Sequence, residues 1–147
     1  MLSTIRRVSS TVNKHGYKFK NETELRKGVE NWFSKEKLFS GEKYKYGDIS
    51  SWNTANIKDM NGLFCNRWHF NQDLSKWDVR SVKDMRNMFH GCYKYNQELN
   101  DWDVSSVTTM SNMFNGCENF NKDLSKWDVS SVTNMEGMFN GCKKNTL

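Results

Sequence analysis

The segment NKDLSKWDVSSVTNMEGMFNGC, residues Asn121–Cys142, decides the fold because it is one copy of a unit that recurs every 25 residues. The period is clearest in five columns in which one residue type, or a close relative of it, returns at the same step. These columns are Trp52, Trp77, Trp102 and Trp127; Ile49, Leu74, Leu99 and Leu124; Ile57, Val82, Val107 and Val132; Met60, Met85, Met110 and Met135; and Phe64, Phe89, Phe114 and Phe139. A fixed period of about 20 to 50 residues indicates a stacked-repeat architecture.

The composition agrees with such a stack. The chain has 147 residues, of which 36% are hydrophobic, and its mean hydropathy of -0.87 is low for a globular core. In a stacked repeat each coil buries its apolar side against its neighbours and keeps long polar faces. The aromatic content of 14% argues against disorder. Proline is absent, so every backbone amide is able to donate a hydrogen bond.

Within a repeat the pattern predicts two elements. Residues 73–77 are typical of a short strand, and residues 78–81 of a turn. Val82, Met85, Met88 and Phe89 then follow a helical spacing, with Ser81 as N-cap and Gly91 as the helix end. The equivalent caps are Asn56, Ser106 and Ser131, and the equivalent ends are Gly116 and Gly141.

We therefore predict an α/β solenoid, a right-handed, leucine-rich-repeat-like coil of four strand–turn–short helix repeats at about 47–71, 72–96, 97–121 and 122–145. Its strands would form a parallel sheet on one side. The period lies in the leucine-rich-repeat range. The predicted domains are a basic flexible arm (1–21), an N-terminal capping helix with a linker (22–46) and the solenoid (47–147).

The predicted capping helix covers residues 22–37. Asn21 is a suitable N-cap with Glu24 at the capping-box distance. The apolar residues that follow share one helix face, namely Leu25, Val29, Trp32 and Phe33. We expect this face to shield the first coil, as the terminal cap of a repeat stack does.

The net charge of +5 belongs to the first 21 residues, which carry Arg6, Arg7, Lys14, Lys18 and Lys20 and no acid. Two interpretations of the start MLSTIRRVSSTV remain open, a flexible basic tail and a mitochondrial presequence. The sequence has neither an apolar run of a length that spans a membrane nor the apolar core of a secretory signal. We expect a location inside a cell, an organelle or a virus particle rather than a secreted surface protein.

The wording FNKDLSKWDVSSVTNMEGMFNGC, residues 120–142, closely resembles the BspA-like leucine-rich repeats. These repeats occur in mycoplasma and other bacterial surface proteins, and in proteins of protists and large DNA viruses. The helix LRKGVENW and the lead-in Tyr46-Gly47-Asp48-Ile49 are similar to the family as well, so the resemblance covers about residues 22–142. It implies a binding or adhesion module without catalytic residues.

Other repeat columns allow more than one interpretation. Cys92, Cys117 and Cys142 form a row, which favours small buried thiols over inter-coil disulfides or a tetrahedral metal site. Two acidic columns favour turn capping over calcium binding. They are Asp48, Asp73, Glu98 and Asp123, and Asn53, Asp78, Asp103 and Asp128. Asn71, Asn96 and Asn121 are predicted to bond backbone groups of their own and adjacent coils. The tryptophan column favours core stacking over an aromatic binding stripe.

No catalytic arrangement is present in the sequence. His15, His69 and His90 lack partners, and there is neither a phosphate loop nor a metal-protease motif. We predict no enzyme activity, no cofactor, no small-molecule substrate and no membrane span.

The leading hypothesis is therefore a protein-interaction or structural scaffold module, within a larger assembly or associating end to end with a second copy. Its surface would comprise Arg67, Trp68, Tyr93 and Lys94, plus the uncapped last coil with exposed Met135, Met138 and Phe139, since exposed apolar patches mark contact sites. The alternative is binding of nucleic acid or another anionic surface by the basic arm.

Overall fold

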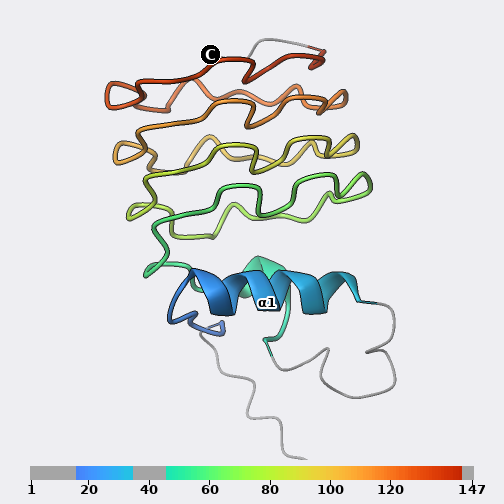
Figure 1. The fold of residues 1–147 in the computed structure, drawn as a ribbon, viewed down its shortest axis with the longest axis vertical. Coiled ribbons are helices and arrows are strands. Elements are labelled where there is room, and N and C mark those ends of the chain that lie inside the picture. The colour runs from blue at the N-terminus through green and yellow to red at the C-terminus, as the bar shows by residue number, and fades with distance from the viewer. Residues whose placement is uncertain (1–15, 35–45, 144–147) are drawn as a thin grey trace, which may run out of the picture.

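The chain folds as a stack of four coils closed at one end by a helix (Figure 1). The computed structural model describes residues 16–34 and 46–143. We call the repeats coil 1 (residues 47–71), coil 2 (72–96), coil 3 (97–121) and coil 4 (122–143). Within the described residues the helical elements are the α-helix α1, Glu22–Phe33, and the short 3-10 turn η3, Ile49–Ser51. The coils follow one another up the stack in chain order, and α1 lies against coil 1.

The predicted α/β solenoid is wrong. In the described part of coils 1 to 4 there is no α-helix and no β-sheet, so the strand–turn–helix repeat and the leucine-rich-repeat assignment have no support. Neighbouring coils are joined instead by isolated parallel bridges, which are Asp59 to Asp84, Asp84 to Thr109, and Thr109 to Asn134. These bridges lie in the very segment that the apolar spacing assigned to a helix.

Left-handed backbone explains why this segment is not helical. Two columns, four residues apart in each coil, have φ between 54° and 78°. An L-residue in this conformation costs about 1–2 kcal/mol, and only glycine and, to a lesser degree, asparagine adopt it readily. The columns contain only these two types: Gly62, Asn87, Asn112 and Gly137, and Asn66, Gly91, Gly116 and Gly141. The backbone therefore enters the left-handed conformation twice in a segment where an α-helix needs right-handed φ and ψ at every residue.

The backbone amides of this segment also donate to acceptors other than those of an α-helix. Alternate amides donate to the next coil, as from Asn87 to the carbonyl of Ser111 at 3.0 Å. The amides between them donate to the carbonyl three residues earlier, as from His90 to Asn87 at 3.1 Å. A run of tight turns therefore produces the apolar spacing of three, three and one, and every second amide ties the coil to its neighbour.

The predicted strand at residues 73–77 is a turn as well. The carboxylate of Asp73 accepts a bond from the amide of Ser75 at 2.8 Å, and the amide of Trp77 donates to the carbonyl of Leu74 at 2.9 Å. Aspartate favours such turns because its side chain bonds the backbone two residues on. Polar side chains thus use the local backbone groups that a sheet would have paired.

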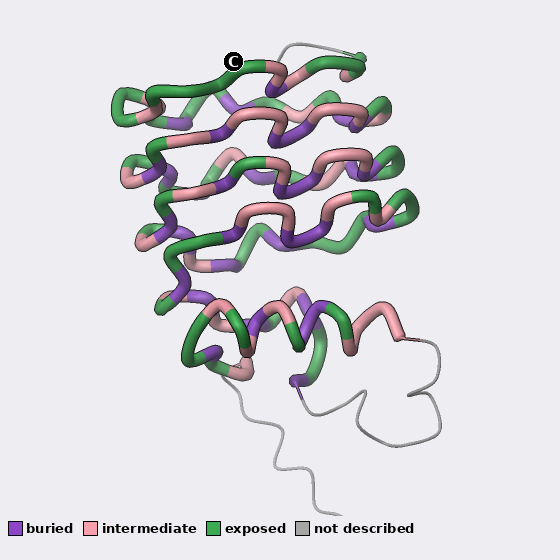
Figure 2. The backbone as a smooth tube through the Cα atoms, viewed as in Figure 1, coloured by how far each residue is buried: buried purple, intermediate pink, exposed green. Residues whose placement is uncertain are grey.

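Aromatic columns fill the inside of the stack, where each coil shows buried stretches between exposed ones (Figure 2). The rings of Phe64, Phe89 and Phe114 are fully buried and stack at centroid distances of 5.7 and 5.4 Å. Offset-stacked aromatic pairs at such distances add to the stabilisation from burial alone. Each coil therefore packs on the next through the same residue types.

Helix α1 begins where the sequence predicts. The side chain of Asn21 accepts a bond from the amide of Glu24 at 3.0 Å. The helix ends at Phe33, and residues 35–37 of the predicted helix lie outside the described residues. Leu25 and Val29 are buried in the core shared with coil 1. The division of the chain into three domains stays a prediction.

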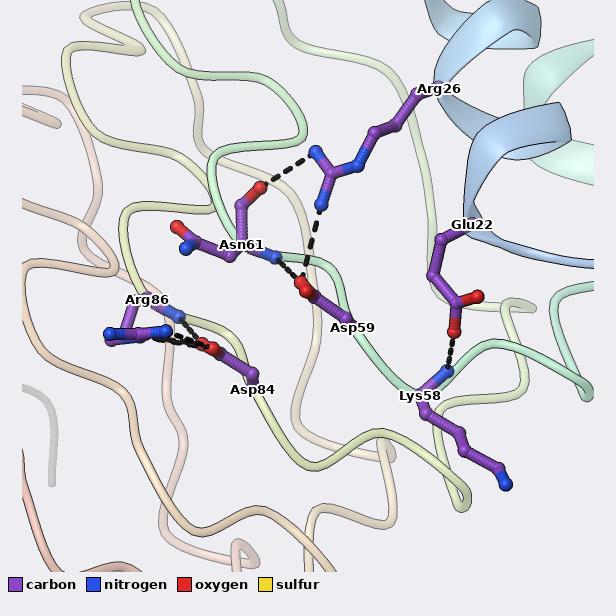
Figure 3. Close-up of polar contacts among 7 residues, drawn as sticks. All are labelled: Glu22, Arg26, Lys58, Asp59, Asn61, Asp84 and Arg86. Atoms are coloured by element: carbon purple, nitrogen blue, oxygen red, sulfur yellow. Dashed lines mark hydrogen bonds and ion pairs between the residues drawn. The ribbon is translucent and has the colours of Figure 1, made fainter.

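Two charged side chains of α1 take the place of a preceding coil (Figure 3). The amide of Lys58 donates to the Glu22 carboxylate at 2.8 Å, whereas its counterpart in coil 2, Lys83, donates to coil 1. The Arg26 guanidinium donates to the carbonyl of Asn61 at 2.8 Å and to Asp59 at 3.2 Å. The bond from Lys58 holds the pKa of Glu22 below its usual value. Helix α1 thus satisfies backbone groups that stacking alone leaves unpaired.

The segment before α1 also packs on coil 1. Phe19 is fully buried, its amide donates to the carbonyl of Asn53, and the amide of Asn53 donates to the carbonyl of Tyr17. Residues 16–20, which the sequence analysis assigned to the arm, therefore belong to the stack. Residues 1–15 of the predicted arm lie outside the described residues.

Candidate functional site

Two aromatic side chains stand out at one edge of the stack. Trp68 is 66% exposed and Tyr93 is 43% exposed. They occupy the same position in coils 1 and 2, and the backbone holds them there. The amide of Lys94 donates to the carbonyl of Trp68 at 3.0 Å, and the amide of Asn119 donates to the carbonyl of Tyr93 at 3.2 Å. Large exposed apolar side chains on a fixed backbone are typical of contact sites.

An open groove of about 400 Å³ lies beside these aromatic residues, and we call it the Trp68–Tyr93 groove. Its lining is Trp68, His69, Gly91, Tyr93, Lys94 and Gly116. The two glycines stack closely, since a Cβ on Gly116 would lie 3.5 Å from the Cα of Gly91. A Cβ on Gly91 would lie 2.5 Å from the side-chain oxygen of Asn66, so the left-handed glycines let successive coils pack closely beside the groove.

The groove carries positive charge. The Lys94 ammonium lies 5.9 Å from the centroid of the Tyr93 ring, and none of the ion pairs within the described residues involves it. Arg67, also predicted to bind a partner, contacts α1, and its partner binding stays a prediction. Its guanidinium pairs with Glu30 of α1 at 2.6 Å and lies 4.4 Å from the centroid of the Phe33 ring. Arg67 therefore fastens α1 to coil 1 and does not line the groove.

The last coil presents part of the predicted apolar surface. Met135 is 40% exposed, and Phe139 is half-buried with its ring 5.9 Å from that of Phe114. Met138 is only 3% exposed, so the expected exposure of this side chain is not found. Coil 4 thus contributes Met135 and Phe139 to the surface, away from the groove lining.

The tryptophan column is buried rather than presented as a stripe. Trp52, Trp77, Trp102 and Trp127 are at most 6% exposed. From Trp77 onward each indole donates to a carbonyl of the preceding coil, for example from Trp102 to Leu74 at 3.0 Å. The column therefore joins successive coils through both packing and hydrogen bonds.

The asparagine column performs its predicted structural role. The side-chain oxygen of Asn71 accepts a bond from the amide of Asn96 at 2.9 Å, and that of Asn96 accepts from the amide of Asn121 at 3.1 Å. The inter-coil bonds confirm the prediction for the side chains of Asn71 and Asn96. In the acidic columns the carboxylates likewise accept amides two residues on, as from Ser105 to Asp103 and from Ser130 to Asp128.

The cysteine row lies against backbone carbonyls. Each thiol donates to a phenylalanine carbonyl of the preceding coil, at distances from 2.9 to 3.2 Å, in Cys92, Cys117 and Cys142. All four cysteines, including the partly exposed Cys65, are free. Burial raises the pKa of Cys92 to about 12 and that of Cys142 to about 11, and it also raises the pKa of Cys117.

We expect Cys65 to be alkylated by iodoacetamide at pH 8 on the order of a hundred times faster than Cys92 and Cys117. The thiolate is the reactive species, and burial suppresses both its formation and its access to the reagent. Mass spectrometry of peptides from a time course measures the rates. Equal rates in the native protein would contradict the buried row, and equal rates in guanidinium are the control.

Side chains able to hold a metal ion do not gather in the described part of the chain. No group of three or more His, Cys, Asp or Glu side chains in residues 16–34 and 46–143 has a metal-binding arrangement. His69 lines the groove, whereas His90 lies half-buried. Among the same residues, no helix is both long enough and apolar enough to cross a membrane.

The period, the coil stack and its repeated inter-coil bonds define a repeat protein. The chain belongs to the family described as "Mycoplasma protein of unknown function, DUF285", which matches residues 33–146. No curated protein and no solved structure matches the chain. The matched residues include all four coils and therefore the whole groove.

The sequence indicated Trp68, Tyr93 and Lys94 but not the two glycines of the groove lining. Gly91 and Gly116 were interpreted as helix ends. Their alignment with Asn66 was the available signal, because a column of glycine and asparagine indicates left-handed backbone rather than a helix cap alone.

Proposed function

We propose that the chain is a non-catalytic protein-interaction module of the BspA-like type, which binds a partner protein through the Trp68–Tyr93 groove. The exposure of two large aromatic side chains beside one groove carries this proposal. Aromatic residues dominate binding energy at protein interfaces because they bury large areas with few rotatable bonds. The likeness of residues 120–142 to BspA-like repeats supports the same class of function.

The backbone around the groove supports binding without rearrangement. Inter-coil bonds fix the carbonyls of both Trp68 and Tyr93. Phe70 and Tyr95, two residues further on, are buried and stacked with an interplanar angle of 1°. A preformed site loses little conformational freedom on binding, so more of the contact energy is available as affinity.

A scaffold within a larger assembly is a specific form of this proposal. In that form Met135 and Phe139 of coil 4 provide a second contact, with a partner or with a second copy. The two surfaces belong to different coils, so one molecule has the means to join two neighbours. Variants at Met135 and at Trp68 are then expected to affect different contacts.

The test is capture from an extract of the native source with the immobilised full-length chain. We expect at least one protein to be retained by the wild type and lost with the double variant Trp68→Ala/Tyr93→Ala. Lys76→Ala is the matched control, because Lys76 is exposed and lies outside the groove lining. Equal capture by all three chains would contradict binding through the groove.

A further inference from the structure

We propose that the Trp68–Tyr93 groove recognises a short acidic segment of the partner, in which an apolar side chain stands beside a carboxylate. The inference rests on the proposed function and specifies the partner's chemistry. It follows from the apolar walls of the groove and the sign of the charge in the lining.

The aromatic walls of the groove predict that the ligand carries an apolar side chain. Trp68 and Tyr93 project from neighbouring coils, and both line the groove together with Gly91 and Gly116. A ligand side chain seated there touches aromatic rings and displaces water from apolar surface, which is favourable in proportion to the area buried. A purely polar segment would gain nothing from these contacts.

The charged residues of the groove lining predict that the ligand is negatively charged. The groove contains Lys94 and His69 and no carboxylate. Six other basic side chains in the described residues have carboxylate partners, namely Arg26, Arg67, Arg80, Arg86, Lys122 and Lys126. Lys94, like Lys76 and Lys83, has no ion pair among the described residues, and its ammonium lies 5.9 Å from the centroid of the Tyr93 ring. A partner carboxylate beside the seated apolar side chain would therefore pair with Lys94.

The next coils fix where that carboxylate lies. The column of Trp68 and Tyr93 continues with Glu118 in coil 3 and Lys143 in coil 4. Glu118 is exposed and repels an acidic ligand, while the Lys143 ammonium donates to the side chain of Asn119 at 3.1 Å. The acidic part of the segment is thus placed along coil 2, next to Lys94.

The same observations favour a peptide over single-stranded nucleic acid. Nucleic acid also stacks on exposed aromatic rings, but its affinity comes from a row of cations along the phosphates. Acidic and basic side chains are nearly balanced over the described residues, and Glu118 interrupts the column beside the groove. One lysine matches one or two carboxylates rather than a polyanion.

The experiment selects peptides from a random displayed library on the full-length chain. The most enriched peptide is then titrated by fluorescence anisotropy, with an oligothymidine strand as the second probe. We expect enriched sequences to carry Asp or Glu beside an aromatic or aliphatic residue. We expect Trp68→Ala to weaken binding about tenfold or more and Lys94→Gln about two- to fivefold. Lys94→Glu should weaken binding further, and Lys76→Glu should leave it unchanged.

Several results would overturn the inference. The first two are the absence of enrichment and the enrichment of basic or uncharged sequences. The others are a peptide affinity that is unchanged by substitution of Trp68 or of Lys94, and Trp68-dependent binding of oligothymidine without peptide binding. The three substituted side chains are exposed, so the variants are expected to fold, and circular dichroism checks this.

The failure of the inference is distinguishable from that of the proposed function. If native partners are lost with Trp68→Ala but retained with Lys94→Glu, the groove binds protein and only the acidic chemistry is wrong. If both variants retain the partners that the wild type captures, binding through the groove is wrong.

Discussion

Replacing Phe89 with alanine is expected to lower the free energy of unfolding by about 3–5 kcal/mol, the usual cost of removing a buried phenylalanine. Phe89 is fully buried. Its ring stacks on Phe64 at 5.7 Å, on Phe114 at 5.4 Å and on Tyr95 at 4.2 Å. The cavity would open between coils 1, 2 and 3 together. Urea unfolding followed by circular dichroism measures the change.

Phe139→Ala is the matched control, because Phe139 occupies the same column in coil 4. Its ring is half-buried, and within the described residues it stacks on the ring of Phe114 alone. We expect a cost of about 1–2 kcal/mol, in proportion to the smaller buried area. Equal costs at positions 89 and 139 would contradict a core that is built from coil-on-coil stacking.

Replacing Gly116 with valine is expected to cost about 2–3 kcal/mol. Its φ of +75° lies in the left-handed region, where a β-branched residue is strongly disfavoured. The new Cβ would also lie 3.5 Å from the Cα of Gly91, so its two methyl groups have little room against the neighbouring coil. Thermal unfolding measures the loss. An unchanged midpoint would contradict the left-handed turn.

Substitutions of Asn112 distinguish a left-handed turn from the predicted helix, because the stability difference between the glycine and alanine variants has opposite signs in the two structures. With φ of 55°, glycine is expected to be tolerated here better than alanine by about 1 kcal/mol. In a helix the order reverses, because alanine is preferred over glycine by about 1 kcal/mol. Both variants lose the bond from Asn115 to the Asn112 side chain, so this loss cancels in the comparison. If the alanine variant were more stable than the glycine variant, the result would contradict the left-handed turn and support the predicted helix.

The sequence reveals the period and the columns but not the local backbone. The 25-residue step, the buried Phe and Trp columns and the Asn21 cap of α1 can all be read from residue types, because stacking identical coils aligns identical residues. The helix in each coil was a wrong prediction, since successive turns place Val82, Met85 and Phe89 at the spacing of a helical face. The deciding signal was Asn87 aligned with Gly62, two residue types that share mainly their tolerance of positive φ.

The candidate site was predictable only in part for the same reason. Trp68 and Tyr93 lie at a position that differs between coils, between the repeated aromatic columns that begin at Phe64 and Phe70, and residues outside the repeat pattern are free to serve contacts. Arg67 shares that variability, yet it binds Glu30 of α1, a contact 37 residues away in sequence. Met138 shares the apolar character of Met135, yet the turn around Gly137 buries it. Three-dimensional packing decides both cases.

Site-specific photo-crosslinking tests the central claim most directly. A photoreactive phenylalanine analogue replaces Tyr93 in one full-length chain and Lys76 in another, and both chains are illuminated in an extract of the native source. We predict a covalent adduct with a partner protein from position 93 and none from position 76. Adducts of equal yield from both positions, or from position 76 alone, would contradict binding through the Trp68–Tyr93 groove.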